Sequence, residues 1–328
     1  MFATLLSRKR STLLAAAMAS CLGAGLVQAS VDEVHFLIPG GAGGGWDGTA
    51  RGTGEALTKS GLVKSASYEN LSGGGGGKAI AHLIEVADQA DNTLMVNSTP
   101  IVIRSLSKVF PQSFRDLTPV AATIGDFGAF VVPAKSKYHS FTEMAKDYLA
   151  DPRSVTVAGG SARGSMDHLV AAMAFKASGG DPRRVKYLAY DAGGKAMAGL
   201  LSGEADVLST GFSEALALAA AGEVRILAMT GEERSPAALD VPTLKELGYN
   251  NAVFVNWRGF FGAPGLSDAK RDEFVTLLEK MYATQEWADV RDRNGWAETF
   301  KPGAQFVSFL EQQEQEMGDL MRELGFLK

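Results

Sequence analysis

Short apolar runs alternate with amphipathic segments along most of the chain. Runs with the length and composition of strands occupy residues 35–38, 66–71, 93–97, 117–133, 154–158, 185–190, 206–210, 224–230 and 256–263. The segments between them predict helices at about residues 48–59, 78–88, 141–150, 166–177, 194–202, 213–221, 268–284 and 304–324. Because strands and helices alternate, the pattern predicts an α/β fold with mainly parallel sheets flanked by helices.

The long apolar run at residues 117–133 differs from the others, and we interpret it as a segment that can cross from one domain to another. A chain of 328 residues is long enough for two domains, each with its own core. The last predicted helix carries an apolar stripe that we expect to pack against the first domain. The stripe consists of Phe306, Phe309, Leu310, Met317, Leu320, Met321 and Leu324.

Residues 1–29 have the pattern of a secretory signal peptide. The basic residues 8–10 precede an uncharged run rich in Leu and Ala, and Val27 and Ala29 supply small residues before the expected cut. An N-terminal membrane anchor is an alternative, but the run is short for a span of about 20 residues. A lipoprotein cut before Cys21 is a second alternative. We favour cleavage after Ala29 and export to the periplasm.

Removal of residues 1–29 takes away three cations and no anions, which leaves 29 Lys and Arg against 37 Asp and Glu, a formal charge of −8. This acidity argues against a nucleic-acid partner. A site that supplies local dipoles and a few cations can still bind a small anion. Cys21 is the only cysteine, so the predicted mature chain has no disulfide and no thiolate metal site.

A glycine loop at residues 40–45 joins the first strand to the first helix. Its backbone N–H groups can face a ligand, and the helix N-terminus that follows favours negative charge. Trp46 and Asp47 come next, and we interpret Asp47 as the N-cap that holds the loop in shape. A second glycine run at residues 73–77 fits either a flexible connector or a loop that lines the same cleft.

A polar loop at residues 159–165 precedes another predicted helix. Ser161 and Ser165 carry hydroxyl donors, Gly164 lets the backbone approach a ligand, and the helix presents its free N–H groups. Ser98 and Thr99 end a strand, where they can add donors or form a plain turn.

Arg163 and Arg258 are the cations that we place near a multiply charged anion, because Arg binds carboxylates with two parallel hydrogen bonds. Arg258 could equally form a surface ion pair. His168 fits a packed helix histidine better than a catalytic base.

The glycines also allow a dinucleotide-binding interpretation. Residues 43–48 match G-x-G-x-x-G after a strand, and Glu69 lies 21 residues beyond Gly48. Pro39 and the extra glycines loosen the turn, however, and Trp46 with Asp47 puts bulk and negative charge where a pyrophosphate would lie. We therefore favour an anion other than a nucleotide.

Catalytic and metal-binding patterns are absent from the sequence. There is no H-E-x-x-H or G-x-S-x-G motif, and the four histidines, at positions 35, 82, 139 and 168, lack the spacing of metal ligands. The residues therefore predict a binding protein that is not an enzyme and that needs no cofactor.

The chain resembles the extracytoplasmic substrate-binding receptors of tripartite tricarboxylate transporters over nearly all of its predicted mature length. The matching segments keep their order and spacing: Pro39-Gly40-Gly41 with Asp47 and Arg51, Glu69-Asn70 before glycines, and residues 158–168, 203–207 and 227–242. Residues 44–47 (GGWD) and 256–259 (NWRG) resemble the tricarboxylate, citrate-type branch more than the dicarboxylate, amino-acid and aromatic-acid receptors.

This resemblance implies a two-lobed, type II-like periplasmic binding protein, with a mainly parallel sheet flanked by helices in each lobe and a two-strand hinge. We expect residues 30–124 plus 232–328 in the first lobe and residues 125–231 in the second. The resemblance also implies that the lobes close on a citrate-like tricarboxylate and that the closed form docks on a membrane permease. The alternatives are a receptor for another organic acid and a dinucleotide-binding enzyme.

We expect a monomer that hinges near residues 123–126 and 230–233, where Gly125 and Gly231 can absorb the backbone change. The sequence names neither the carboxylate nor the permease. The expected ligand contacts are Gly40, Gly41, Gly44, Gly45, Trp46, Asp47, Ser98, Thr99, Ser161, Arg163, Gly164, Ser165, Tyr190 and Arg258.

Overall fold

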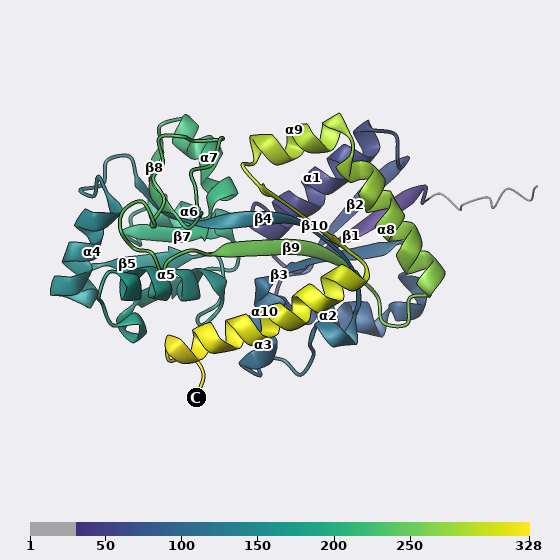
Figure 1. The fold of residues 1–328 in the computed structure, drawn as a ribbon, viewed down its shortest axis with the longest axis horizontal. Coiled ribbons are helices and arrows are strands. Elements are labelled where there is room, and N and C mark those ends of the chain that lie inside the picture. Colours follow the sequence, from purple (N-terminus) through teal and green to yellow (C-terminus); the bar gives the residue numbers. More distant parts are fainter. Residues whose placement is uncertain (1–30) are drawn as a thin grey trace, which may run out of the picture.

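A mixed sheet of ten strands extends through the molecule, with helices on both of its sides (Figure 1). The structure, a computed structural model, describes residues 31–328. The predicted signal peptide and its alternatives at residues 1–29 lie outside the described residues. Within residues 31–328, no helix combines the length and the apolar character that a membrane span requires.

The strands are β1 (Glu33–Ile38), β2 (Ser65–Asn70), β3 (Thr93–Ser98), β4 (Thr118–Pro133), β5 (Thr156–Gly159), β6 (Lys186–Ala189), β7 (Val207–Gly211), β8 (Val224–Met229), β9 (Val255–Gly262) and β10 (Ala297–Pro302). The helices are α1 (Gly45–Lys59), α2 (Gly77–Glu85), α3 (Thr99–Leu106), α4 (Phe141–Ala150), α5 (Met166–Ala177), α6 (Gly193–Leu201), α7 (Phe212–Ala220), α8 (Asp268–Tyr282), α9 (Gln285–Arg293) and α10 (Ala304–Glu323). Every strand and helix expected from the pattern is present, with ends that shift by a few residues.

The pattern of apolar and polar residues does not predict three elements, namely α3, α9 and β10. Helix α3 carries Pro100 in its first turn, where a fixed φ and a missing N–H suit a helix start, although the same residues also fit a turn. Helix α9 buries only Trp287 and Val290, so it has no continuous apolar stripe. Strand β10 shows no alternation of buried and exposed positions.

The sheet has parallel pairs at its outer parts and antiparallel pairs in the middle. Its order is β2-β1-β3-β9-β4-β7-β5-β6, with β10 and β8 also paired to β4. Strand β1 lies parallel to β2 and β3, and β5 lies parallel to β6 and β7. All pairs of β4 and β9 are antiparallel. The expectation of parallel strands therefore holds away from these two crossing strands.

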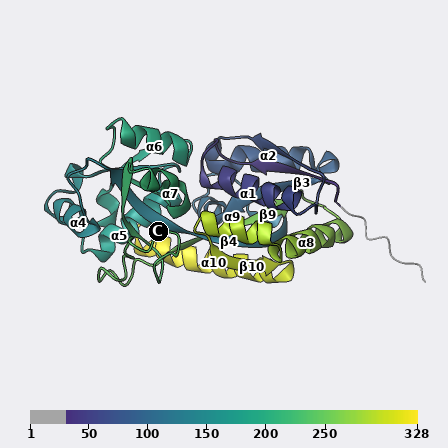
Figure 2. The same ribbon diagram turned by 90° about the horizontal axis from the view of Figure 1, so that it is seen from above.

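Strand β4 connects two lobes. Its first part pairs with β9 as far as Phe127 and with β10 as far as Gly125. From Gly128 onward it pairs with β7 and β8 instead. Figure 2 shows the consequence: α4 to α7 gather at one end of the molecule, and α1, α2, α8 and α9 gather at the other. The long apolar run thus crosses from one lobe to the other.

Thr230 joins the three segments that cross between the lobes. Its hydroxyl accepts a hydrogen bond from the Gly128 N–H at 2.8 Å and donates one to the Phe254 carbonyl at 2.6 Å. Its backbone N–H bonds the Gly128 carbonyl at 2.9 Å, and the Phe254 N–H bonds its carbonyl at 3.0 Å. Because Thr230 is fully buried, these bonds fix the spacing of the crossing segments away from water.

The segment between β8 and β9 packs on the second lobe. The Tyr249 ring lies 5.3 Å from the ring of Phe141 in α4, and the Met229 N–H bonds the Pro242 carbonyl at 3.0 Å. The expected lobe boundaries at residues 124/125 and 231/232 stay a prediction, and these contacts favour a second boundary near residue 254.

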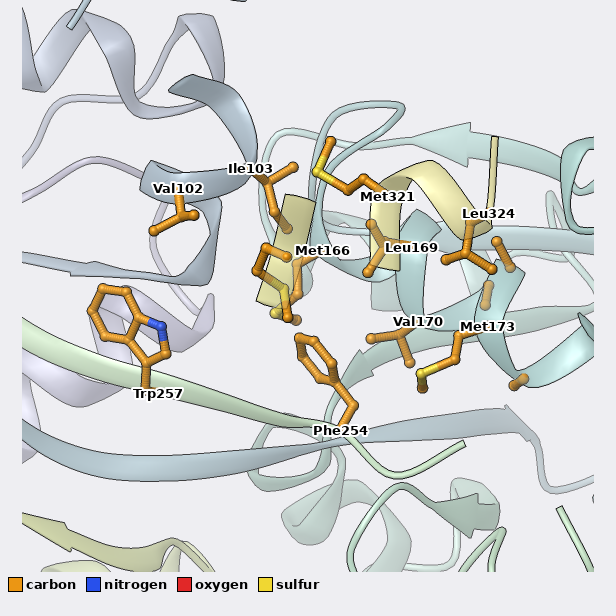
Figure 3. Packing of buried hydrophobic residues seen from close by; sticks show 14 of the residues in the cluster. Val102, Ile103, Met166, Leu169, Val170, Met173, Phe254, Trp257, Met321 and Leu324 are labelled. Atoms are coloured by element: carbon orange, nitrogen blue, oxygen red, sulfur yellow. The ribbon is translucent and has the colours of Figure 1, made fainter. Parts of the chain in front are cut away.

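One apolar core is continuous across both lobes (Figure 3). It contains Ile103 of the first lobe, Leu169 and Val170 of the second, and Met321 and Leu324 of α10. The stripe of α10 packs against α3 in the first domain, as expected, and its last turns also reach α5 in the second.

Polar and aromatic contacts at the end of α10 agree with this placement. Lys176 of α5 pairs with Glu323 at 2.6 Å, and the Phe326 ring lies 4.9 Å from the ring of His168. Helix α10 thus runs along the join between the lobes.

We predict that Thr230→Val destabilises the fold. Valine keeps the shape but removes the hydroxyl, so the Gly128 N–H and the Phe254 carbonyl lose this buried partner, at about 1–3 kcal/mol for each group left unsatisfied. The free energy of unfolding in urea measures the loss. Thr53→Val is the matched control, because the buried Thr53 hydroxyl has no hydrogen-bond partner among residues 31–328. Equal losses in the two variants would contradict the role of Thr230.

Candidate functional site

A cleft of about 510 Å³ lies between the two lobes, open on one side to solvent. Both lobes contribute to its walls, and its lining consists of Gly40, Gly41, Gly44, Gly45, Trp46, Ser98, Pro100, Gly160, Ser161, Met166, Asp167, Asp191, Ala192, Gly193, Glu214, Asn256 and Arg258.

Five helices present their first turns to this cleft. Its lining includes residues from the N-terminal ends of α1, α3, α5, α6 and α7. At such an end the first N–H groups have no partner within the helix, and the helix dipole contributes roughly half a positive charge. The cleft is therefore suited to an anion whose oxygens accept backbone hydrogen bonds.

The first glycine loop lines one wall as predicted. Trp46 lies over Gly40, and its Nε1 donates to the Ser98 hydroxyl at 2.8 Å, which joins the loop to the end of β3. Across the cleft, a Cβ at Gly41 would come within 3.1 Å of the Ala192 Cβ. The two lobes thus nearly touch at this point, and only residues without a large side chain fit there.

Asp47 holds this loop, but from a different position than expected. The N-cap of α1 is Gly44, so the prediction that Asp47 is the N-cap is wrong. Asp47 is the third helical residue, and its carboxylate reaches back to accept the Gly43 N–H at 3.1 Å. It also accepts from Arg51 Nε at 2.9 Å and from Asn70 at 3.0 Å. It therefore supports the loop from behind and does not line the cleft.

The second loop contributes Ser161 to the cleft but not Arg163. The Arg163 guanidinium donates to the Tyr187 carbonyl at 2.7 Å, so its expected place beside a ligand is not observed. Gly164, with φ of 77°, donates its N–H to His168 Nδ1 at 3.0 Å. Ser165 is the buried N-cap of α5. Neither Gly164 nor Ser165 lines the cleft.

Two further expected contacts lie outside the cleft lining. Tyr190 donates its hydroxyl to Glu204 at 2.7 Å, and Thr99 is buried in the first turn of α3. His168 is a packed histidine, as expected, because its ring stacks on the Tyr187 ring at 4.6 Å. Burial, and to a smaller extent the charge of Arg163, lowers the pKa of His168 to about 4, so its ring is neutral near pH 7.

The glycine run at residues 73–77 is neither a free connector nor part of the cleft lining. Gly74–Gly76 form a short 3-10 helix. A Cβ at Gly75 would come within 2.7 Å of Arg104 Nε, and one at Gly77 within 2.9 Å of the Phe110 ring. The run therefore covers these side chains, which a larger residue would displace.

A buried ion pair forms the floor of the cleft. Arg258, with 2% of its side chain exposed, donates from Nη2 to the fully buried Asp126 at 2.7 Å. The same nitrogen lies 3.7 Å from Glu214 Oε1, and Nη1 donates to the Thr49 hydroxyl at 3.2 Å. The alternative of a surface ion pair for Arg258 is therefore wrong.

Two acidic side chains in the cleft hold their protons unusually strongly. Burial raises the pKa of Asp167 to about 7, against the opposing effects of the Ser161 hydroxyl and of Arg258. Burial also raises the pKa of Glu214 to about 8, helped by the neighbouring Asp167 and Asp126 and opposed by Arg258. Near neutral pH both groups can therefore donate a hydrogen bond.

Sequence reasoning missed the acidic residues of this site. Asp126 stands in the middle of an apolar strand, and Glu214 is the only charged residue of an alanine-rich helix. The sequence signal that could have identified these two residues is an isolated acidic residue in an apolar segment. Asn256 also lines the cleft, and neither its Oδ1 nor Arg258 Nε has a hydrogen-bond partner among residues 31–328. Within the same residues, no group of His, Cys, Asp and Glu could hold a metal ion.

Comparisons with known proteins agree with this architecture. A family model described as tripartite tricarboxylate transporter family receptor matches residues 50–326. The UPF0065 protein of the tcbD-tcbE intergenic region of Pseudomonas sp. (strain P51) is 25% identical over 256 residues, which are 77% of this chain and 74% of that protein.

Two solved structures share the fold. The periplasmic binding protein BugD superposes with a TM-score of 0.80 at 19% identity, over 89% of this chain and 97% of BugD. MatC from Rhodopseudomonas palustris with bound malate superposes with a TM-score of 0.76 at 19% identity, over 88% of this chain and 98% of MatC. The predicted class, a two-lobed α/β periplasmic binding protein, is confirmed.

We predict that the unliganded protein loses stability as the pH rises from about 5 to 9. The folded state keeps protons on Asp167 and Glu214 that the unfolded chain releases near pH 4, so it binds more protons in this range. Each group contributes a slope of at most about 1.4 kcal/mol per pH unit.

Urea unfolding at several pH values measures this slope. Glu214→Gln should flatten it, whereas Glu279→Gln, on the exposed face of α8, should not. A wild-type slope equal to that of Glu214→Gln would contradict the raised pKa.

Proposed function

Because the chain belongs to the receptor family of tripartite tricarboxylate transporters, we propose that it is a periplasmic receptor for a small organic acid with at least two carboxylates. It captures the acid between its lobes and delivers it to the membrane subunits of the transporter. Its role is binding, not catalysis.

The convergence of five helix N-termini on one cleft carries this proposal. Each end offers backbone donors that need no counter-charge, so a carboxylate can be bound without an excess of basic side chains. The unpartnered Arg258 Nε and Asn256 Oδ1 add polar atoms that suit a carboxylate and a hydroxyl group. Malate, which MatC binds, combines these groups.

The charges around the cleft favour a dicarboxylate over a tricarboxylate. Arg258 is the one cation among the lining residues, and Asp126 already neutralises it. A third carboxylate would therefore face the buried acids without a cation of its own. The citrate-like tricarboxylate expected from the sequence stays a prediction, which the same binding experiment tests.

A thermal-shift series with malate, succinate and citrate tests the proposed function. A ligand at a hundred times its Kd stabilises the folded protein by about 2.7 kcal/mol. We expect a shift with malate or succinate and a smaller one with citrate. NAD should give none. A shift with NAD and none with the acids would instead favour the dinucleotide-binding alternative.

Arg163→Ala serves as the matched variant in this series. Because Arg163 bonds the Tyr187 carbonyl away from the cleft, the variant should bind malate and citrate within about threefold of the wild type. A charge-assisted hydrogen bond contributes roughly 1.5–3 kcal/mol. A selective loss of tenfold or more for citrate would therefore show that Arg163 turns toward a third carboxylate.

We propose further that ligand capture involves a hinge motion at the crossing segments. The walls that approach each other, at Gly41 and Ala192, belong to different lobes, so their separation widens the entrance to the cleft. Of the expected pivots, Gly231 directly follows Thr230, which ties the crossing segments together, and Gly125 lies three residues before Gly128, which Thr230 bonds. A closed, loaded form gives the permease a shape to distinguish from the empty receptor.

We predict that the radius of gyration in small-angle scattering decreases when malate is added. The ligand lowers the free energy of the closed form through its contacts with the second lobe, which shifts the population. The control is the same titration with NAD. Tight binding of malate without any change in the scattering curve would rule out hinge closure.

A further inference from the structure

Two carboxyl groups lie next to the Arg258 guanidinium at the floor of the cleft, Asp126 at 2.7 Å and Glu214 at 3.7 Å, and a third, Asp167, lines the same cleft. Asp126 comes from β4, Asp167 from α5 and Glu214 from α7, and Arg258 comes from β9. A Cβ placed on Gly211 would lie 2.6 Å from Asp126 Oδ2 and 2.7 Å from Glu214 Oε1. The two carboxyl groups therefore share one small volume next to Arg258.

This arrangement holds more acids than it can ionise. The buried cation, Arg258, balances the charge of one carboxylate, and that carboxylate is Asp126, which it bonds at 2.7 Å. A second and a third negative charge in the same desolvated volume would repel each other and Asp126. Entry of an anionic ligand adds still more negative charge. The protonated forms of Asp167 and Glu214 are therefore favoured most when the ligand is bound.

We propose that Asp167 and Glu214 bind the organic acid as protonated carboxyl groups, so that capture of the ligand is coupled to proton uptake. This inference rests on the proposed function. Each carboxyl O–H donates a hydrogen bond to the ligand, while its ionised form would repel the ligand. Asp167 and Glu214 therefore set both the pH dependence of binding and the preference for an anionic ligand over a cationic one.

Other titratable groups near the cleft do not replace these two. Tyr187 stays protonated because burial raises its pKa well above 10. Asp191 is held ionised by Ser72 and Lys195, which lower its pKa. Asp47 is bonded to Arg51 and the Gly43 N–H. The raised pKa values of Asp167 and Glu214, about 7 and about 8, agree with the geometry.

Glu214 also has a path to solvent that does not use the cleft. A second pocket of about 380 Å³ shares Gly44, Gly45, Glu214 and Arg258 with the cleft. On its other side it is lined by Ser213, Asn294 and Trp296, among others. Glu214 thus lies between the two spaces, and a proton can reach it while a ligand fills the cleft.

Isothermal titration of the mature protein with malate in two buffers of different ionisation enthalpy tests the proposal. Malate is fully ionised above pH 7, so any proton taken up goes to the protein. We expect a net uptake of between one and two protons per malate at about pH 8, because Glu214 is already about half protonated there before the ligand binds. The affinity should fall by up to tenfold per pH unit for each proton as the pH rises to 9.

Glu214→Gln keeps the size and a hydrogen-bond donor but cannot ionise. The variant should no longer take up the proton that Glu214 binds, and the affinity for malate should depend less on pH. Glu279→Gln, remote from the cleft in α8, should leave the uptake unchanged. The wild-type measurement alone decides the proposal if the Glu214 variant does not fold.

Binding of malate without proton uptake, or with proton release, overturns this inference and leaves the proposed function standing. If malate, succinate and citrate all fail to bind at pH 6 and at pH 9, the proposed function fails, and the inference fails with it.

Discussion

The buried ion pair between Arg258 and Asp126 is the contact on which the cleft depends. It lies where β9 and β4 cross between the lobes, and it extends to both sides. Arg258 donates to Thr49 in α1 of the first lobe, and Asp126 accepts from the Ser213 hydroxyl at the start of α7 in the second. Because loss of one partner of such a pair costs about 3–5 kcal/mol, the floor of the cleft is the least replaceable part of the site.

This pair also explains where the positive potential of the cleft must come from. Since Asp126 already neutralises Arg258, attraction for an anion depends on the helix N-termini. Several glycines belong to the same arrangement, since a Cβ at Gly45 would collide with the Arg258 guanidinium and one at Gly193 with the Glu214 carboxyl group. Close packing of the charged groups, more than flexibility, explains the glycine at these two positions.

The sequence allowed the fold to be predicted better than the site. Apolar runs located the expected strands, including the crossing of β4, because burial of a strand leaves a local pattern. The glycine loop at residues 40–45 could also be predicted from a local pattern, because a strand, glycines and the start of a helix follow one another in the sequence. Asp126 and Glu214 meet only through the pairing of β4 with β7 and the start of α7, and no local pattern reports that meeting. Arg163 lies outside the cleft lining, and its loop position could not have indicated the direction of its side chain.

The continuous core limits how the lobes can separate. Met166 belongs both to the cleft lining and to the core that joins α3, α5 and α10 (Figure 3). Apolar contacts are not directional, so these residues can slide while they stay out of water, whereas complete separation would expose them. Opposite this core, the walls meet through Gly41 and Ala192, small residues with little apolar area to lose. In the opening that we propose, the lobes therefore pivot on the side of α10, and the glycine loop moves away from α6. The Arg258–Asp126 pair then lies near the axis of this rotation, where movement is least.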